Sequence, residues 1–109
     1  TIQGDGSQYR KFVYVEDLAL GCVRALQPAG KNRIYNLEGD VKITIKEIAE
    51  TVQELIGDVQ IEYTDGRKAD FSGKEISNAR AKQEIGWYPC ISFREGMKRY
   101  IDWRKTLDL

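Results

Sequence analysis

The stretch from Arg10 to Asp17 constrains the fold of this 109-residue chain more than any other segment. It reads R-x-F-V-Y-V-x-D, in which two aromatic residues alternate with two valines. In an extended backbone the aromatic residues share one face and the valines share the other. Both faces are then apolar, which is typical of a short strand covered on both sides. An amphipathic stretch follows at once, so the strand is expected to lead directly into a helix.

Glycine, proline and helix-capping patterns divide the rest of the chain into short elements. Thr44 and Ser92 each precede a Glu by three residues, the capping-box signature of a helix start. The expected helices are Glu16–Gln27, Ile45–Ile56, Asn78–Ile85 and a last one from Ser92 to about Lys105; the expected strands are Phe12–Val15, Arg33–Glu38 and Val59–Thr64. Residues 65–74 are expected to form a loop. These elements predict an α/β fold, with α+β-like character, of three to four helices with short strands.

Several side chains have a predicted structural role. The first helix carries an apolar stripe that is expected to face inward, namely Leu18, Ala19, Cys22, Val23 and Leu26. Asp17 is interpreted as a negative charge near the start of that helix, where it interacts favourably with the helix dipole. The block Trp87-Tyr88-Pro89 is expected to pack the chain back onto its core. Gly4 and Gly6 are interpreted as turn residues.

Composition excludes several classes of protein. Seventeen Lys and Arg balance seventeen Asp and Glu, so no overall field favours nucleic acid or an anionic membrane. No apolar run approaches the roughly 18 residues that span a bilayer, and a cytoplasmic location is expected. The chain has no His, so a metal site is not expected. Cys22 and Cys90 are expected to be reduced and buried, although the sequence leaves a disulfide between them open.

Two further blocks follow the Arg10–Asp17 motif along the chain: Tyr35-Asn36-Leu37 and then Ile85-Gly86-Trp87-Tyr88-Pro89. Together the three resemble the C-terminal part of the extended short-chain dehydrogenase/reductases, the NAD-dependent nucleotide-sugar epimerases and dehydratases. The resemblance implies that residues 1–109 form one substrate-binding fragment whose N-terminal Rossmann domain is absent. The glycine-rich dinucleotide fingerprint and the family's Tyr-x-x-x-Lys pair are both missing from the sequence. No catalytic residue and no cofactor are therefore expected in this chain, and NAD(P) is expected in the complete enzyme.

The resemblance also implies a site for a nucleoside-diphosphate sugar. Arginine presents a planar fork that pairs with two phosphate oxygens at once. By resemblance, Arg10 and Arg67 contact the diphosphate, Asp70 contacts a ribose hydroxyl, and Gln8 contacts the nucleotide. Ala69 stands where the family usually has a glycine, which weakens the match at Asp70.

The expected function is the nucleotide-sugar-binding portion of an NAD(P)-dependent epimerase or dehydratase, with UDP-glucose 4-epimerase as the leading parent activity. The sequence does not separate an epimerase from a dehydratase, a decarboxylating enzyme or a keto-sugar reductase. The alternative is a non-enzymatic α/β module that binds a nucleotide or another protein. The fragment is further expected to form a homodimer through its Arg33–Leu37 strand or its first helix, because both lose the cover of the missing domain.

Overall fold

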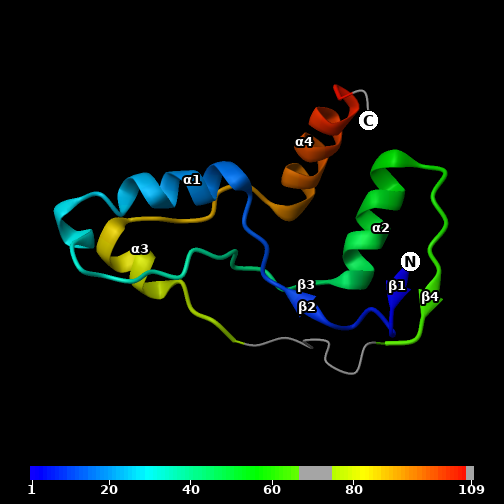
Figure 1. Cartoon of the computed structure of the whole chain (residues 1–109), viewed down its shortest axis with the longest axis horizontal. Coiled ribbons are helices and arrows are strands. Elements are labelled where there is room, and N and C mark those ends of the chain that lie inside the picture. The colour runs from blue at the N-terminus through cyan, green and yellow to red at the C-terminus, as the bar shows by residue number, and fades with distance from the viewer. Residues whose placement is uncertain (67–74, 108–109) are drawn as a thin grey trace.

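The computed structural model describes residues 1–66 and 75–107 of the chain (Figure 1). In chain order its elements are β1 (Ile2–Gln3), β2 (Tyr9–Arg10), α1 (Val15–Arg24), the 3-10 helix η1 (Pro28–Gly30), β3 (Ile43–Thr44), α2 (Ile45–Ile56), β4 (Tyr63–Thr64), α3 (Ala79–Ile85) and α4 (Phe93–Lys105). Four α-helices joined by short strands confirm the predicted fold class.

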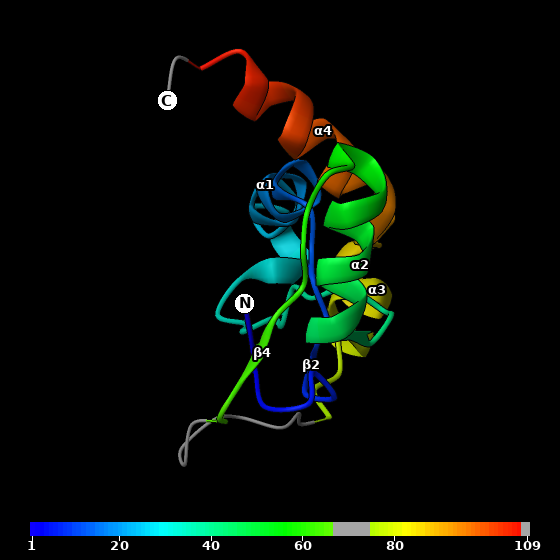
Figure 2. The same cartoon turned by 90° about the vertical axis from the view of Figure 1, so that its right-hand side faces the viewer.

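The elements are spread over a flat, elongated molecule. α1, η1 and α3 gather at one end, α2 with β1 and β4 lies at the other, and α4 stands between the two ends (Figure 1). From the side, α1 lies on one side of the molecule and α2 and α3 on the other (Figure 2). The molecule measures 49 × 36 × 20 Å and its radius of gyration is 16.5 Å. A compact domain of about 100 residues has a radius of about 13 Å, so this chain is more open than an ordinary domain.

Two small ladders tie distant segments together. β1 pairs in parallel with β4, with Ile2 opposite Tyr63. β2 pairs antiparallel with β3, with Tyr9 opposite Thr44 and Arg10 opposite Ile43. The turn between β1 and β2 uses Gly4 and Gly6, both at a φ of 78°, a conformation that glycine adopts without steric cost.

The densest packing surrounds Trp87, which is 0% exposed. Its core neighbours are Ala81 and Ile85 from α3, and the partly buried Val13 and Leu37 pack against this cluster. The indole nitrogen of Trp87 donates a hydrogen bond of 2.7 Å to the backbone oxygen of Asp17. The predicted core-packing role of the Trp87 block is confirmed for Trp87, whereas Tyr88 is 55% exposed.

Two predicted strands are absent from the described residues. Residues 12–14 are irregular, and Val15 is the first residue of α1 rather than the last of a strand. Residues 33–38 also lack a ladder, since no backbone hydrogen bond joins 34–38 to another described residue. The apolar side chains of these segments predict strands because they indicate an extended backbone that is buried on both faces. A strand also needs a backbone partner, and the described residues supply none here.

The prediction for the first helix was right about its existence and wrong about its buried face. α1 runs from Val15 to Arg24 and buries Asp17 and Gly21. The apolar stripe faces outward, with Leu26 just beyond the helix 86% exposed. Both cysteines are exposed and free, which contradicts the expectation of buried thiols. The inversion arises because the small Gly21 and the hydrogen-bonding Asp17 fit against Trp87, whereas the bulky side chains do not.

The other helices follow their sequence signals closely. α2 has the predicted bounds, and the amide of Glu47 donates to the Thr44 hydroxyl oxygen at 3.1 Å. α4 starts after Ser92, whose hydroxyl oxygen accepts from the amide of Glu95 at 3.2 Å. α3 starts at Ala79, one residue later than predicted, and ends at Gly86 in the left-handed conformation. Of the strand predicted over residues 59–64, only the last two residues form β4.

Candidate functional site

The β2–β3 ladder is the structural base of the candidate site. Gln8 precedes β2, and its backbone oxygen accepts a hydrogen bond of 2.9 Å from the amide of Ile45. Arg10 lies opposite Ile43, a buried residue. This pairing fixes the backbone of Arg10 beside the segment that connects residue 39 to α2.

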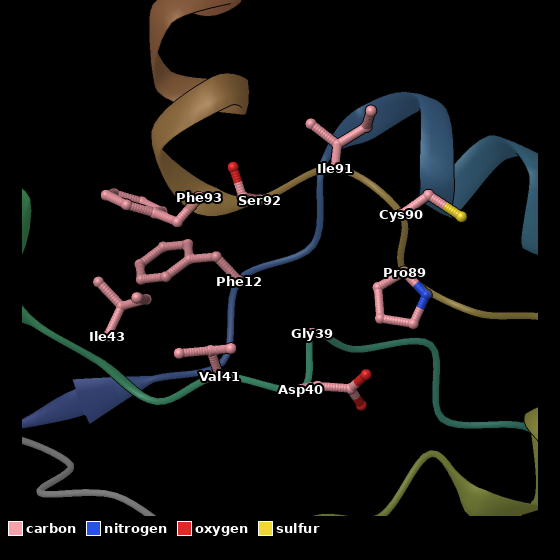
Figure 3. A pocket seen from close by; sticks show the side chains of 10 residues that line it. All are labelled: Phe12, Gly39, Asp40, Val41, Ile43, Pro89, Cys90, Ile91, Ser92 and Phe93. Carbon is pink, nitrogen blue, oxygen red and sulfur yellow. The ribbon is translucent and has the colours of Figure 1, made fainter.

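A cavity of about 270 Å³ opens next to this ladder (Figure 3). Its walls come from three segments far apart in the sequence, and the residues that line it are Phe12, Gly39, Asp40, Val41, Ile43, Pro89, Cys90, Ile91, Ser92 and Phe93. The rings of Phe12 and Phe93 pack with centroids 5.4 Å apart and planes inclined at 48°. The wall is mainly apolar, and Asp40 and Ser92 bring polar side chains to it. Ile43 is also the ladder partner of Arg10, so the backbone of Arg10 runs beside a residue of the cavity wall, although Arg10 itself does not line the cavity.

Two of the four sequence-predicted site residues, Gln8 and Arg10, lie in the described part of the chain, and neither lines this cavity. Arg10 donates from Nη1 to the backbone oxygen of Tyr9 at 2.7 Å. Gln8 donates from Nε2 to the backbone oxygen of Gln3 at 3.0 Å, across the β1–β2 turn. Arg67 and Asp70 lie outside the described residues, so the proposed arginine pair stays a prediction.

Cationic side chains cluster around β2. Continuing the β2–β3 register by one residue puts Lys11 opposite Lys42. Like charges in facing positions repel, and the carboxylate of Glu75 relieves this by pairing with both, at 3.5 Å from Lys11 and more closely with Lys42. The hydrogen bond from Lys42 lowers the pKa of Glu75, and the same contact raises the pKa of Lys42. Lys42 also lies over the ring of Tyr9 at 4.9 Å, which adds a cation–π contact.

The acidic residue of the cavity wall is held from the α3 side. Asp40 Oδ1 accepts hydrogen bonds from Lys82 Nζ at 2.7 Å and from Asn78 Nδ2 at 2.9 Å. These two bonds, the one from Lys82 first, lower the pKa of Asp40 below its ordinary value. Asn78 also donates to the backbone oxygen of Glu38 at 2.9 Å, so one buried amide anchors the segment that leads into the cavity.

Sequence reasoning missed the aromatic and backbone parts of this site. Phe12 was predicted to be a covered strand residue and Phe93 falls in the first turn of the predicted last helix, yet together they form part of the cavity wall. Phe93 directly follows Ser92, so the capping box that starts α4 also places the ring. The signal for Val41 and Ile43 was weak, because they lie in a stretch without a marked period.

The described residues show no cluster of metal ligands, and no glycine-rich turn follows β2 or β3. Residues 1–66 and 75–107 contain no group of three or more Cys, Asp or Glu side chains able to hold a metal ion. A dinucleotide site needs a glycine-rich turn between a strand and a helix. β3 runs directly into α2 without a glycine, and residues 11–14 connect β2 to α1 without one. In the same described part of the chain, no helix is long and apolar enough to cross a membrane.

Comparison with known proteins identifies the class to which this fold and site belong. Residues 1–37 match the NAD dependent epimerase/dehydratase family. Over 105 residues the chain is 38% identical to a UDP-glucuronate 4-epimerase of Thermodesulfobacterium geofontis, covering 95% of this chain and 32% of that protein. The chain belongs to the NAD-dependent epimerase/dehydratase family.

Solved structures give the same result. A UDP-glucose 4-epimerase of Thermotoga maritima, solved with UDP-glucose, superimposes with a TM-score of 0.89 at 31% identity, covering 98% of this chain and 35% of that one. A UDP-glucuronic acid 4-epimerase of Bacillus cereus, solved with UDP-glucuronic acid and NAD, gives 0.83 at 25% identity, covering 96% and 34%. The chain thus spans about a third of the length of the relatives it matches.

Proposed function

We propose that this chain is the nucleotide-sugar-binding part of an NAD(P)-dependent sugar epimerase or dehydratase, and that it is not catalytic alone. The observation that supports the proposal is the pairing of Arg10 with Ile43, because Ile43 lines a largely apolar cavity and the backbone of the arginine runs beside it. Such a site suits a ligand with an anionic part and a flat apolar part, as in a nucleoside diphosphate.

The chemistry around β2 favours the diphosphate in particular. Arg10, Lys11 and Lys42 follow one another around the ladder, and Glu75 is the acidic side chain that pairs with the two lysines. A guanidinium can form two parallel hydrogen bonds to phosphate oxygens, whereas the lysines act as point charges. In this proposal Arg10 and Arg67 bind the diphosphate. Asp70 binds a ribose hydroxyl, and Gln8 contacts the nucleotide.

The reaction proposed for the whole protein is inferred from its relatives. Those compared above act on UDP-glucose and UDP-glucuronic acid, and one was solved with NAD. UDP-glucose 4-epimerase-like chemistry is the leading candidate, in which the cofactor would be held by a Rossmann domain outside these residues. The task of this part is then to hold the diphosphate while the sugar reorients.

Replacement of the arginines tests the proposal. In the complete protein, Arg10→Ala and Arg67→Ala should each weaken UDP binding by about 1.5–3 kcal/mol, the range for hydrogen bonds to charged groups. Isothermal titration calorimetry with UDP measures the change. Arg104→Ala is the control, because Arg104 is exposed near the far end of α4. If both site variants stay folded and bind UDP as tightly as the unsubstituted protein, the assignment is wrong.

A further inference from the structure

Asp17 is a buried carboxylate that the proposed ligand contacts do not use. It lies in the first turn of α1 and is 5% exposed. Its Oδ2 accepts two backbone hydrogen bonds, from the amide of Cys90 at 3.0 Å and from the amide of Ile91 at 2.9 Å. Its backbone oxygen accepts the bond from the Trp87 indole. Asp17 therefore accepts hydrogen bonds from three residues of the segment between α3 and α4, namely Trp87, Cys90 and Ile91.

This segment forms one wall of the cavity. Residues 89–93 all line it, and Figure 3 shows them running across its top into α4. Among the described residues, the amides of Cys90 and Ile91 have no backbone acceptor, so the Asp17 carboxylate is what satisfies them. Hydrogen bonds to an ionised carboxylate are about twice as strong as neutral ones, and a buried amide left without an acceptor is costly.

The position of Phe93 depends on the same contact. Phe93 begins α4 two residues after Ile91, and its ring packs on the ring of Phe12 in the cavity wall. Asp17 itself does not line the cavity. Its effect on a ligand would therefore act through the wall that it fixes.

We propose that Asp17 is the positioning residue of the nucleotide site: its carboxylate holds the Cys90–Ile91 backbone and thereby sets the wall, including Phe93, against which the nucleotide packs. The inference rests on the proposed function. It assigns Asp17 a role in ligand affinity beyond the helix-dipole interaction that its place in the sequence indicates.

Three variants of this chain separate positioning from stability. Asp17→Leu keeps the approximate size and removes the acceptor, whereas Asp17→Asn retains one acceptor oxygen. Gly57→Ala is the matched control, because Gly57 has a φ of 77° at the end of α2 and no atom within 4 Å of its added Cβ. This control loses stability through backbone strain alone, away from the wall.

UDP is the probe, titrated into each variant and followed by the amide signals in two-dimensional nuclear magnetic resonance. We expect Asp17→Leu to bind about tenfold more weakly, Asp17→Asn to stay within about threefold of the unsubstituted chain, and Gly57→Ala to bind unchanged. Equal affinity of a folded Asp17→Leu would overturn the role of Asp17. Should that variant not fold, the unsubstituted chain decides: UDP must shift the amide signals of Cys90 and Ile91, and unchanged signals at saturation refute the inference. No UDP binding by the unsubstituted chain would instead refute the proposed function.

Discussion

Asp40 is the residue whose charge state most directly couples the cavity wall to α3. The hydrogen bonds from Lys82 and Asn78 stabilise its ionised form, which lowers its pKa below the ordinary 3.8. A carboxyl group with a lower pKa in the folded state stabilises the protein above its unfolded pKa. That contribution is lost as the pH falls through the folded value.

We therefore predict that Asp40→Asn reduces the acid sensitivity of the fold. Between pH 6 and pH 3 the free energy of unfolding should fall less in this variant than in the unsubstituted chain, because the variant has no carboxylate to protonate at this position. Urea unfolding at the two pH values measures the difference. Asp102→Asn, which removes an exposed carboxylate from α4, is the comparison variant. An equal loss in both variants would contradict the role given to Lys82 and Asn78.

At the scale of elements, α1 packs through its smallest residue. A Cβ added at Gly21 would lie 2.5 Å from Leu37 Cδ1 and 3.1 Å from the Trp87 indole nitrogen. Alanine is favoured over glycine inside a helix by about 1 kcal/mol. The contact with Leu37 is shorter than van der Waals distance, so the added methyl group opposes that gain.

We expect Gly21→Ala to destabilise the chain by about 1–3 kcal/mol, the usual cost of overpacking a filled contact. Thermal or urea unfolding measures it. Gly96→Ala in α4 is the comparison, since its nearest contact is a side-chain carbon of Tyr14 at 3.0 Å and is less severe. A gain of stability in Gly21→Ala would mean that α1 does not pack closely on Trp87.

The same helix shows where sequence reasoning succeeds and where it fails. The starts of α2 and α4 follow from Thr44 and Ser92, because capping is local and a few residues determine it. The buried face of α1 does not follow, because its burial depends on what packs against it. The apolar stripe predicts an inward face in a complete protein, whereas Asp17 and Gly21 are the residues that contact the described core.

The candidate site was predictable to a similar degree. The motif around Arg10 indicates a phosphate ligand by resemblance, and the structure pairs that residue with Ile43, which lines the cavity. The cavity itself arises from residues 12, 39–43 and 89–93, which meet only through the fold. Sequence periodicity describes local structure, so it could not predict that Phe12 contacts Phe93.

For the molecule as a whole, the first prediction concerns the cofactor. We expect this chain alone to show no measurable NAD binding and no turnover of a nucleotide sugar, because it contains neither the glycine fingerprint nor the Tyr-x-x-x-Lys pair. Titration calorimetry with NAD and a coupled epimerase assay test this. Micromolar affinity for NAD would refute the proposal that the cofactor domain lies outside these residues.

The second prediction concerns association. α1 and the segment after it expose a series of large apolar side chains, including Val15, Val23, Leu26 and Ile34, the last 83% exposed. Exposed large apolar side chains gathered on one helix and the segment after it favour association, and the zero formal net charge gives little repulsion. We propose that the isolated chain forms a two-fold dimer through this surface.

Light scattering over a dilution series should therefore show dimers that dissociate at low concentration. Val23→Glu, which puts a charge on the exposed face of α1, should shift the dissociation to higher concentration, whereas Lys98→Glu on α4 should not. A monomer at high micromolar concentration would contradict the proposal and would mean that the chain tolerates this surface in water.

The parallel pairing of β1 with β4 has a consequence for the order of folding. It joins Ile2 to Tyr63 through short hydrogen bonds at both ends, from Ile2 to Glu62 and from Gly4 to Thr64. A contact between residues so distant in sequence requires closure of a long loop. The chain loses conformational entropy in this closure before any hydrogen bond of the ladder forms. The helices, whose contacts are local, can form earlier. The contacts of Asp17 with Trp87, Cys90 and Ile91 are equally distant in sequence, but they belong to a buried cluster, whereas each strand of the β1–β4 ladder has only two residues. This ladder is therefore expected to open first in the native state, so that the amide protons of Ile2 and Gly4 exchange with solvent before those packed around Trp87.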